Sequence, residues 1–200
     1  MKRDDIEINA RTSLYKGFFE MSLYTFRHRL FDGGWSGTMT REVFERDPVA
    51  AVLPYDPVRD TVVLLEQFRP GVMAADHPNP WTVEVVAGII EDGETPEAMC
   101  HREAMEEAGC TLGELVPIAN FFPSPGGCTE YVYLYCGRVD SEGLGGIHGL
   151  DHEEEDIRVF VESTDDALRR MESGSIGNAT AILALQWLAL HRAELQARWT

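Results

Sequence analysis

The sequence has few cysteines, and no two of them form a C-x-x-C pair. Its 200 residues include only four, and these are Cys100, Cys110, Cys128 and Cys136. A disulfide framework is typical of short secreted chains that are rich in cysteine, so we expect free, buried thiols here.

Positive charge is also scarce. The chain has 17 Lys and Arg residues against 34 Asp and Glu residues, which gives a formal net charge of −17. Such a field repels nucleic acids and anionic membranes, so a function in binding either is disfavoured. An anionic substrate would have to be attracted by local arginines or by a metal ion.

Apolar segments of the kind that enter membranes are missing. The first ten residues, MKRDDIEINA, contain no apolar core of a signal peptide. The longest apolar stretch, residues 179–190, is too short to span a bilayer and is interrupted by Thr180 and Gln186. We therefore expect a cytoplasmic protein.

The remaining composition, 44% hydrophobic and 26% charged, is that of a globular chain with one domain and an appendage. Residues 1–10 look like a polar tail. Apolar and polar residues alternate over 24–30, and a turn at 32–34 and a return over 38–45 complete a small sheet. Since this sheet is too small for its own core, we expect residues 1–47 to be a dimerisation arm and residues 48–200 to be the main domain.

Strands and helices alternate in the main domain, which predicts an α/β (α+β) fold with a mixed sheet. The predicted strands are 49–53, 61–67, 81–87, 116–122, 130–139 and 157–162, with a loop over 69–80. A helix over 96–108 has clear limits, because Thr95 is a good N-cap, Pro96 suits the first turn and Gly109 suits a left-handed end. Two more helices follow, one capped by Thr164 and one by Asn178.

The helix over 96–108 carries the chemistry that the sequence suggests. Spacings of three and four residues place Glu103, Glu106 and Glu107 on one face. Like charges at such short range repel each other, and a divalent cation such as Mg²⁺ or Mn²⁺ would offset that repulsion. Arg102 is expected to pair with a carboxylate and to fix its orientation.

A glutamate-rich helix by itself is usually only a solvated surface, but the full spacing here is more specific. The pattern consists of Gly88, Glu94, Arg102-Glu103, Glu106-Glu107 and Gly109. Seven fixed positions match by chance about once in a hundred million windows. This pattern resembles the Nudix box, although Ala104 and Cys110 stand where larger aliphatic residues are more usual. The sequence is therefore similar to the Nudix hydrolases, whose fold is a mixed sheet between helices.

Within that family, the chain looks most like the ADP-ribose pyrophosphatases. The likeness runs from LYKGFF near the start to NATAILALQWLALH at the end, and Pro125 lies 16 residues after Gly109, a spacing that goes with ADP-ribose. The resemblance implies hydrolysis of ADP-ribose to AMP and ribose 5-phosphate. It also implies two or three Mg²⁺ ions, for which Mn²⁺ can substitute, and a homodimer formed through the N-terminal strands.

The resemblance further implies roles for individual residues. The metal ligands would be the Ala87 carbonyl, Glu103 and Glu107, with Glu106 nearby or sharing. Gly88, Glu94, Arg102 and Gly109 would be structural. The catalytic base would come from the loop 148–157, where Glu153 matches best and Glu155 is the alternative. A zinc site at His148 and His152 is disfavoured, because Gly149 lies between them and no third ligand is near.

Substrate contacts are less well defined by the sequence. Arg69 is the first choice for binding the diphosphate, and Arg41 and Arg46 are weaker candidates. Phe18 or Phe19 is a candidate for stacking on adenine, although phenylalanine in a strand is usually part of a core. Further substrate contacts are expected from the segment that contains Pro125 and Gly126.

Two alternatives remain. The box handles only the diphosphate, so another nucleoside diphosphate sugar such as GDP-mannose is an alternative substrate. A sensor that binds ADP-ribose without cleaving it is the other alternative. It is disfavoured because the glutamates of the box and of the loop are all present.

Overall fold

The computed structural model describes residues 1–150 and 154–200, and it divides into two compact units. The first unit contains Met1–Pro48 and Phe122–Tyr131, and the second contains Val49–Phe121 and Val132–Thr200. The segment Phe122–Tyr131 is distant in sequence from the rest of the first unit, so its place there depends on long-range contacts.

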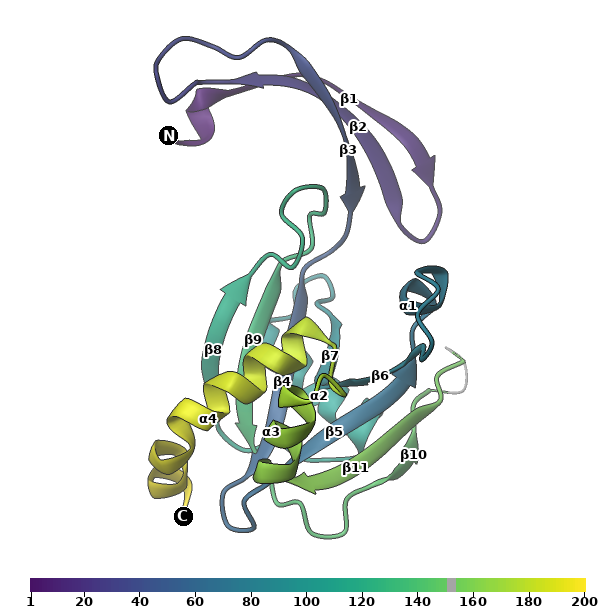
Figure 1. Ribbon diagram of the computed structural model, residues 1–200, viewed down its shortest axis with the longest axis vertical. Coiled ribbons are helices and arrows are strands. Elements are labelled where there is room, and N and C mark those ends of the chain that lie inside the picture. The colour runs from purple at the N-terminus through teal and green to yellow at the C-terminus, as the bar shows by residue number, and fades with distance from the viewer. Residues whose placement is uncertain (151–153) are drawn as a thin grey trace. The chain divides into compact units, whose positions relative to one another are not determined.

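The first unit is built on an antiparallel sheet in the order β1-β2-β3 (Figure 1). Its strands are β1 (Ile6–Lys16), β2 (Glu20–His28) and β3 (Met39–Glu45), preceded by the 3-10 turn η1 (Arg3–Asp5). The prediction of a polar tail over residues 1–10 is wrong. Ile8 pairs with Phe26 across the ladder and Arg27 forms an ion pair with Glu7, so the pairing with β2 orders this segment.

The segment Phe122–Tyr131 joins this unit at the end of β3. The amide of Phe44 donates to the carbonyl of Gly127 at 2.8 Å, and the amide of Thr129 donates to the carbonyl of Phe44 at 3.0 Å. The Thr129 hydroxyl accepts from the Arg46 amide at 2.7 Å. These backbone bonds fix the segment that contains Pro125 and Gly126.

The second unit contains a mixed sheet in the order β10-β11-β5-β4-β9-β8, with β6 paired to β5 and β7 paired to β4. The pairing of β4 with β9 is parallel and the other pairings are antiparallel. The strands are β4 (Val49–Asp56), β5 (Thr61–Phe68), β6 (Trp81–Glu84), β7 (Val86–Ile89), β8 (Leu115–Phe121), β9 (Val132–Arg138), β10 (Gly146–His148) and β11 (Ile157–Ser163).

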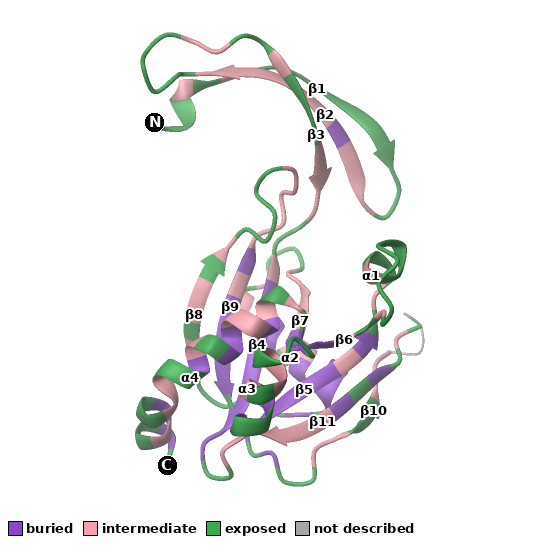
Figure 2. Ribbon diagram, in the orientation of Figure 1, coloured by how far each residue is buried: buried purple, intermediate pink, exposed green. Residues whose placement is uncertain are grey.

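Helices cover both faces of this sheet, as predicted for the fold class (Figure 1). The helix α2 (Pro96–Ala108) packs on one face through side chains such as Met99, which is fully buried. The helices α3 (Thr164–Glu172) and α4 (Ala179–Trp199) pack on the other face, where Leu185 and Leu188 are fully buried. The central strands are accordingly the most buried part of the unit in Figure 2.

Several local predictions need correction. The predicted strand over 81–87 is interrupted at Val85, because β6 pairs with β5 and β7 pairs with β4. The predicted loop over 69–80 contains the short helix α1 (Pro70–Ala74), which begins with a proline. The N-cap of α3 is Ser163, since the hydroxyl of Thr164 is bonded to the carbonyl of Asp60.

The four cysteines are free, as expected, and all but Cys128 are buried. In the described part of the chain, no helix combines the length and the hydropathy needed to cross a membrane.

Candidate active site

The candidate site is built on α2, whose ends form as its sequence predicts. The Thr95 hydroxyl accepts a hydrogen bond from the Ala98 amide at 3.2 Å, and Pro96 occupies the first turn. Gly109 is left-handed, with φ at 60°, and its amide donates to the carbonyl of Met105 at 3.1 Å. The helix therefore presents its glutamates in a fixed register.

Arg102 ties three of the glutamates together. Its Nε donates to Glu94 at 3.0 Å, and its Nη1 donates to Glu103 at 2.7 Å and to Glu106 at 3.0 Å. Its Nη2 also donates to the carbonyl of Ile89 at 3.3 Å. The guanidinium thus fixes the turn before α2 against the helix and orients the carboxylates, which is the role expected of it.

Glu103 and Glu107 lie deepest among the glutamates of the helix. Burial raises the pKa of Glu103, although the charge of Arg102 acts in the opposite direction. Glu107 is 4% exposed, and its carboxylate accepts a hydrogen bond from the Ala87 amide at 3.1 Å. Burial raises the pKa of Glu107 to about 8. Burial therefore disfavours the ionised forms of both carboxylates in the absence of a cation.

This donor set fits a divalent metal ion. Carboxylate oxygens are the ligands that Mg²⁺ and Mn²⁺ prefer, and a cation would stabilise the ionised forms of Glu103 and Glu107. Over residues 1–150 and 154–200, no three His, Cys, Asp or Glu side chains are grouped as a complete metal site. Further donors, such as the predicted carbonyl of Ala87, are therefore needed beside the helix.

The loop predicted to supply the base is described only in part. Glu153, the first choice, lies outside the described residues, as does His152. Glu155 is described, and its carboxylate accepts a hydrogen bond from the Leu150 amide at 3.2 Å. The charge of Glu155 raises the pKa values of both Glu103 and Glu107, so this side chain belongs to the same electrostatic site.

The start of this loop packs against the end of α2. A Cβ atom on Gly109 would lie 2.7 Å from Cε1 of His148, so the imidazole occupies the space beside the glycine. The Nε2 atom of His148 lies 3.2 Å from the carbonyl oxygen of Gly145. His148 therefore packs against the end of α2, and this contact gives no support to the disfavoured zinc site.

Arg69 lies at the end of β5 and is bound by a residue that the sequence analysis missed. Its Nε and Nη2 atoms donate to the two carboxylate oxygens of Glu84 at 2.9 and 2.7 Å. Glu84 is 5% exposed and also accepts a hydrogen bond from the hydroxyl of Thr82. Its signal in the sequence is a single charge within the apolar run WTVEVVAG, because a buried charge needs a partner.

The other predicted substrate contacts lie in the first unit, and the structure brings some of them together. The guanidinium of Arg46 lies 4.7 Å from the ring centre of Phe19 and forms an ion pair with Glu130 at 3.2 Å. Phe18 is 87% exposed and packs edge-on against Phe19. The side chain of Arg41 donates to the carbonyl of its neighbour Thr40 at 2.7 Å.

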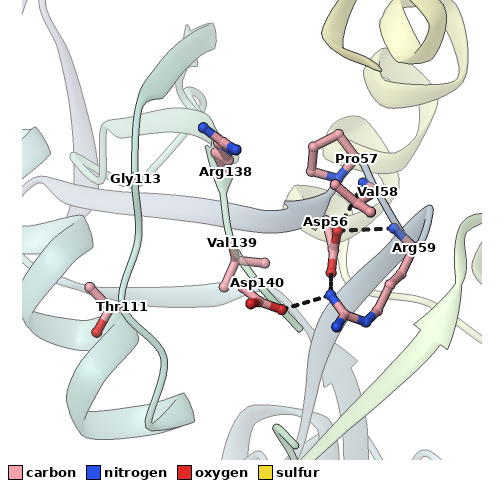
Figure 3. A pocket seen from close by; sticks show the side chains of 9 residues that line it. All are labelled: Asp56, Pro57, Val58, Arg59, Thr111, Gly113, Arg138, Val139 and Asp140. Atoms are coloured by element: carbon pink, nitrogen blue, oxygen red, sulfur yellow. Dashed lines mark hydrogen bonds and ion pairs between the residues drawn. The ribbon is translucent and has the colours of Figure 1, made fainter. Parts of the chain in front are cut away.

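A pocket of about 420 Å³ opens elsewhere on the second unit (Figure 3). It is lined by Asp56, Pro57, Val58, Arg59, Thr111, Gly113, Arg138, Val139 and Asp140, none of which is a predicted site residue. Its Arg59 forms ion pairs with Asp56 and Asp140 at 3.1 and 2.7 Å and also with Glu142. These carboxylates already neutralise Arg59.

Comparison with known proteins gives a family and several relatives. The NUDIX domain family matches residues 45–176. An ADP-ribose pyrophosphatase of Escherichia coli (strain K12) is 49% identical over 198 residues, which cover 98% of this chain and 94% of the relative. An ADP-ribose pyrophosphatase of Haemophilus influenzae is 44% identical over 201 residues, which cover 98% of this chain and 92% of the relative.

More distant similarities agree with the family and the fold. A GDP-mannose pyrophosphatase of Enterobacter sp. (strain 638) is 33% identical over 151 residues, covering 75% of this chain and 78% of the relative. A solved structure described as an ADP compounds hydrolase has a TM-score of 0.73 at 16% identity and covers 98% of this chain and 96% of its own, which supports the fold. With the box on α2 and a family match over residues 45–176, the chain belongs to the Nudix family.

Proposed function

We propose that the protein hydrolyses the diphosphate bond of ADP-ribose in a Mg²⁺-dependent reaction, giving AMP and ribose 5-phosphate. The observation that carries this proposal is the set of carboxylates on α2, oriented by Arg102 and partly buried. The choice of ADP-ribose is supported by 49% identity to the Escherichia coli ADP-ribose pyrophosphatase over 98% of this chain.

The metal would be held by Glu103, Glu107 and the carbonyl of Ala87, with Glu106 nearby or sharing. When bound, Mg²⁺ neutralises charge on the diphosphate and makes its phosphorus easier to attack. Two or three ions, replaceable by Mn²⁺, would serve the site.

Other residues would bind the substrate and move the proton. Arg69 would bind diphosphate oxygens through the edge of its guanidinium that Glu84 leaves open. Glu153, or alternatively Glu155, would take the proton of the attacking water. Single replacements of the two by Gln distinguish them, since loss of the base lowers kcat more than about tenfold.

Further substrate contacts would come from residues of the first unit. Phe18 or Phe19 would stack on adenine, because adenine stacks on aromatic rings. Arg41 and Arg46 would be weaker alternatives to Arg69 for binding the diphosphate, and Pro125 and Gly126 would add further contacts.

We also propose a homodimer formed through the N-terminal strands and a cytoplasmic location. The first unit exposes apolar side chains that a second copy would cover, including Ile8 and Phe31, which are 45% and 99% exposed. The four free cysteines fit the reducing conditions of a cytoplasm.

GDP-mannose is the second candidate substrate, because GDP-mannose pyrophosphatases match this chain at lower identity and coverage. The deciding experiment is product analysis on ADP-ribose, GDP-mannose, NADH and ADP, each with and without Mg²⁺. Metal-dependent release of AMP and ribose 5-phosphate, with the highest kcat/KM for ADP-ribose, is the expected result. A higher kcat/KM for GDP-mannose would make GDP-mannose the proposed substrate in place of ADP-ribose. Binding of ADP-ribose without cleavage would favour the sensor alternative.

The metal site can be tested by Glu107→Gln. The amide keeps an acceptor for the Ala87 amide, and burial already raises the pKa of Glu107, so the fold and the metal-free Tm should be preserved. Loss of the anionic ligand should lower kcat at least about a hundredfold. An unchanged kcat in steady-state assays would rule out Glu107 as a metal ligand.

A further inference from the structure

Glu84 is a buried carboxylate that the reaction as proposed does not use. It is 5% exposed and lies in β6, where its register partner on β5 is the buried Leu65. Side chains alternate between the faces of a strand, so Glu84 and Thr82 share one face of β6. The Thr82 hydroxyl donates to the same carboxylate oxygen as Nε of Arg69, so Glu84 is held from two sides.

The pairing with Arg69 leaves one edge of the guanidinium open. Arginine has five N–H donors, and Glu84 engages one on Nε and one on Nη2. Within the described residues, that guanidinium makes no other hydrogen bond. Its partner Glu84 ends β6, and on the following strand, β7, the amide of Ala87 donates to the candidate metal ligand Glu107. Burial raises the pKa of Glu107, and the charge of Arg69 opposes that effect. The open edge is thus available to an anion bound near Glu107.

We infer that Glu84 is a positioning residue that holds Arg69 in the orientation needed to bind the diphosphate. This inference rests on the proposed function. A free arginine side chain loses rotamer entropy when it binds a ligand, and a side chain already fixed in the free protein loses less. A bidentate carboxylate is well suited to fixing the planar guanidinium. The benefit appears in substrate binding, so it affects KM more than kcat.

The test compares Glu84→Gln with the wild type in steady-state kinetics on ADP-ribose with Mg²⁺. The amide presents an NH₂ group to one of the two donors of Arg69, which disrupts the bidentate pair. KM should rise about tenfold while kcat changes less than about threefold. Glu84→Asp, which keeps the carboxylate, should raise KM less than Glu84→Gln does.

A double substitution tests whether Glu84 acts through Arg69. Arg69→Lys alone should also raise KM, since an ammonium does not reproduce the fork of donors. Combined with Glu84→Gln, it should raise KM no further than the larger single effect, because the two side chains act as one unit. Additive effects would show that Glu84 acts independently of Arg69 and would overturn the inference.

A matched control lies on the neighbouring strand β5 and faces the opposite side of the sheet. Glu66 on β5 forms an ion pair with Arg158 of β11. Glu66→Gln therefore removes one carboxylate from a Glu–Arg pair next to Glu84 in the sheet, but on the other side of it. It should leave KM and kcat within about twofold of wild type. An equal rise in KM in this variant would indicate a general effect of charge.

Other outcomes separate the inference from its rivals. A fall in kcat of a hundredfold or more for Glu84→Gln would make Glu84 part of the reaction centre. A lower KM in the same variant would mean that Glu84 weakens the binding of substrate by Arg69. If Glu84→Gln does not fold, Thr82→Val, which removes one donor to Glu84, should raise KM about two- to threefold. An unchanged KM in that variant would count against the inference.

The positioning role of Glu84 can be tested separately if the proposed function is wrong. If the wild type cleaves none of the four compounds, the Kd for ADP with Mg²⁺, measured by calorimetry, takes the place of KM. A Kd that rises about tenfold in Glu84→Gln and stays unchanged in Glu66→Gln would still support the positioning role. An equal Kd in all three proteins would overturn it.

Discussion

At the scale of single residues, Gly88, which precedes the turn into α2, matters because the side chain of Glu103 lies against it. A Cβ atom on Gly88 would overlap the carboxyl end of Glu103, whose Cγ is 2.7 Å from that position. The carboxylate oxygen nearest to that position, Oε1 of Glu103, accepts a hydrogen bond from Nη1 of Arg102 at 2.7 Å. Moving the carboxylate aside would therefore disturb this ion pair.

Gly88→Ala should accordingly lower activity far more than stability. The added methyl displaces the carboxylate of Glu103, and kcat should fall about a hundredfold while Tm changes by only a few degrees. Gly177→Ala is the matched control, because no atom lies within 4 Å of its Cβ position and its φ is not positive. If both variants keep wild-type kcat in the Mg²⁺ assay, the position of Glu103 does not limit the reaction.

Asp56 shows a different use of a buried carboxylate, since its role is in stability. Burial raises its pKa, but hydrogen bonds from Ser141, Arg59 and Val58 outweigh that effect and lower the pKa from 3.8 to about 2. A pKa below that of the unfolded chain stabilises the folded state above pH 4. That contribution is lost as the pH falls from about 4 through 2. It amounts to about 2 kcal/mol when complete.

Asp56→Asn should therefore lower the free energy of unfolding by about 2 kcal/mol at pH 6, as measured by urea denaturation. At pH 3 roughly half of that difference should remain. Asp140→Asn is the control, because Asp140 also pairs with Arg59 but is 77% exposed, so its effect should be small at both pH values. A difference that does not depend on pH would contradict the ionic origin of the effect.

Sequence patterns identified the residues of the box but missed their neighbour Glu84. The box residues are recognisable because they lie on one helix at fixed spacings. Glu84 and Arg69 are 15 positions apart and meet only because β5 and β6 pair in a particular register. Such partners become visible once the strand pairing is known.

At the scale of elements, α2 and the loop after β10 depend on each other. Gly109 ends α2 in a left-handed conformation, and His148 fills the space where its Cβ would be. The loop that starts at His148 carries both candidates for the base. The end of the helix thus helps to set where the loop begins.

Gly109→Ala should affect catalysis as well as stability. The left-handed backbone should cost about 1 kcal/mol, and displacement of His148 should lower kcat about tenfold. Gly174→Ala is the matched control, since Gly174 follows α3 with φ at 79° and has nothing within 4 Å of its Cβ position. It should lose similar stability in thermal unfolding and keep its kcat.

A second substitution separates strain from displacement. In Gly109→Ala combined with His148→Ala the clash is absent, so kcat should rise above that of Gly109→Ala alone if displacement is the cause. Equal losses of kcat in the Gly109 and Gly174 variants would show that the contact does not position the loop.

Elements with local signals were predicted well, and those held by distant contacts were not. The helix over 96–108 was correct at both ends because its caps are adjacent in sequence. The strand β1 was missed because the alternation of Ile6 and Ile8 with polar residues is a short signal, and this segment is ordered by pairing with β2. The membership of Phe122–Tyr131 in the first unit depends on bonds to Phe44, which no local pattern reveals.

At the scale of the whole molecule, the negative charge is divided unequally. Residues 1–48 and 122–131 contain eight Lys and Arg residues against nine Asp and Glu residues, and the rest of the chain contains nine against 25. The first unit is therefore nearly neutral, and the second carries almost the whole net charge. The proposed contacts of Arg41 and Arg46 with substrate lie in the unit that repels an anion least.

The same unit exposes the apolar side chains that support the proposed dimer. They include Ile6, Ile8, Leu14, Tyr15, Leu30 and Phe31. A sheet of three strands has little core of its own, and a second copy of the chain would remove these side chains from water. Light scattering should give twice the chain mass of 22.4 kDa at micromolar concentration.

Ile8→Glu should shift this equilibrium toward the monomer, because it places a charge among apolar side chains that the second copy is proposed to cover. The concentration at half dissociation should rise about a hundredfold. Ile147→Glu is the matched control, since Ile147 is an isoleucine on an exposed strand of the second unit and is 67% exposed. A wild-type mass of 22.4 kDa, or an equal effect of both substitutions, would contradict a dimer formed through the N-terminal strands.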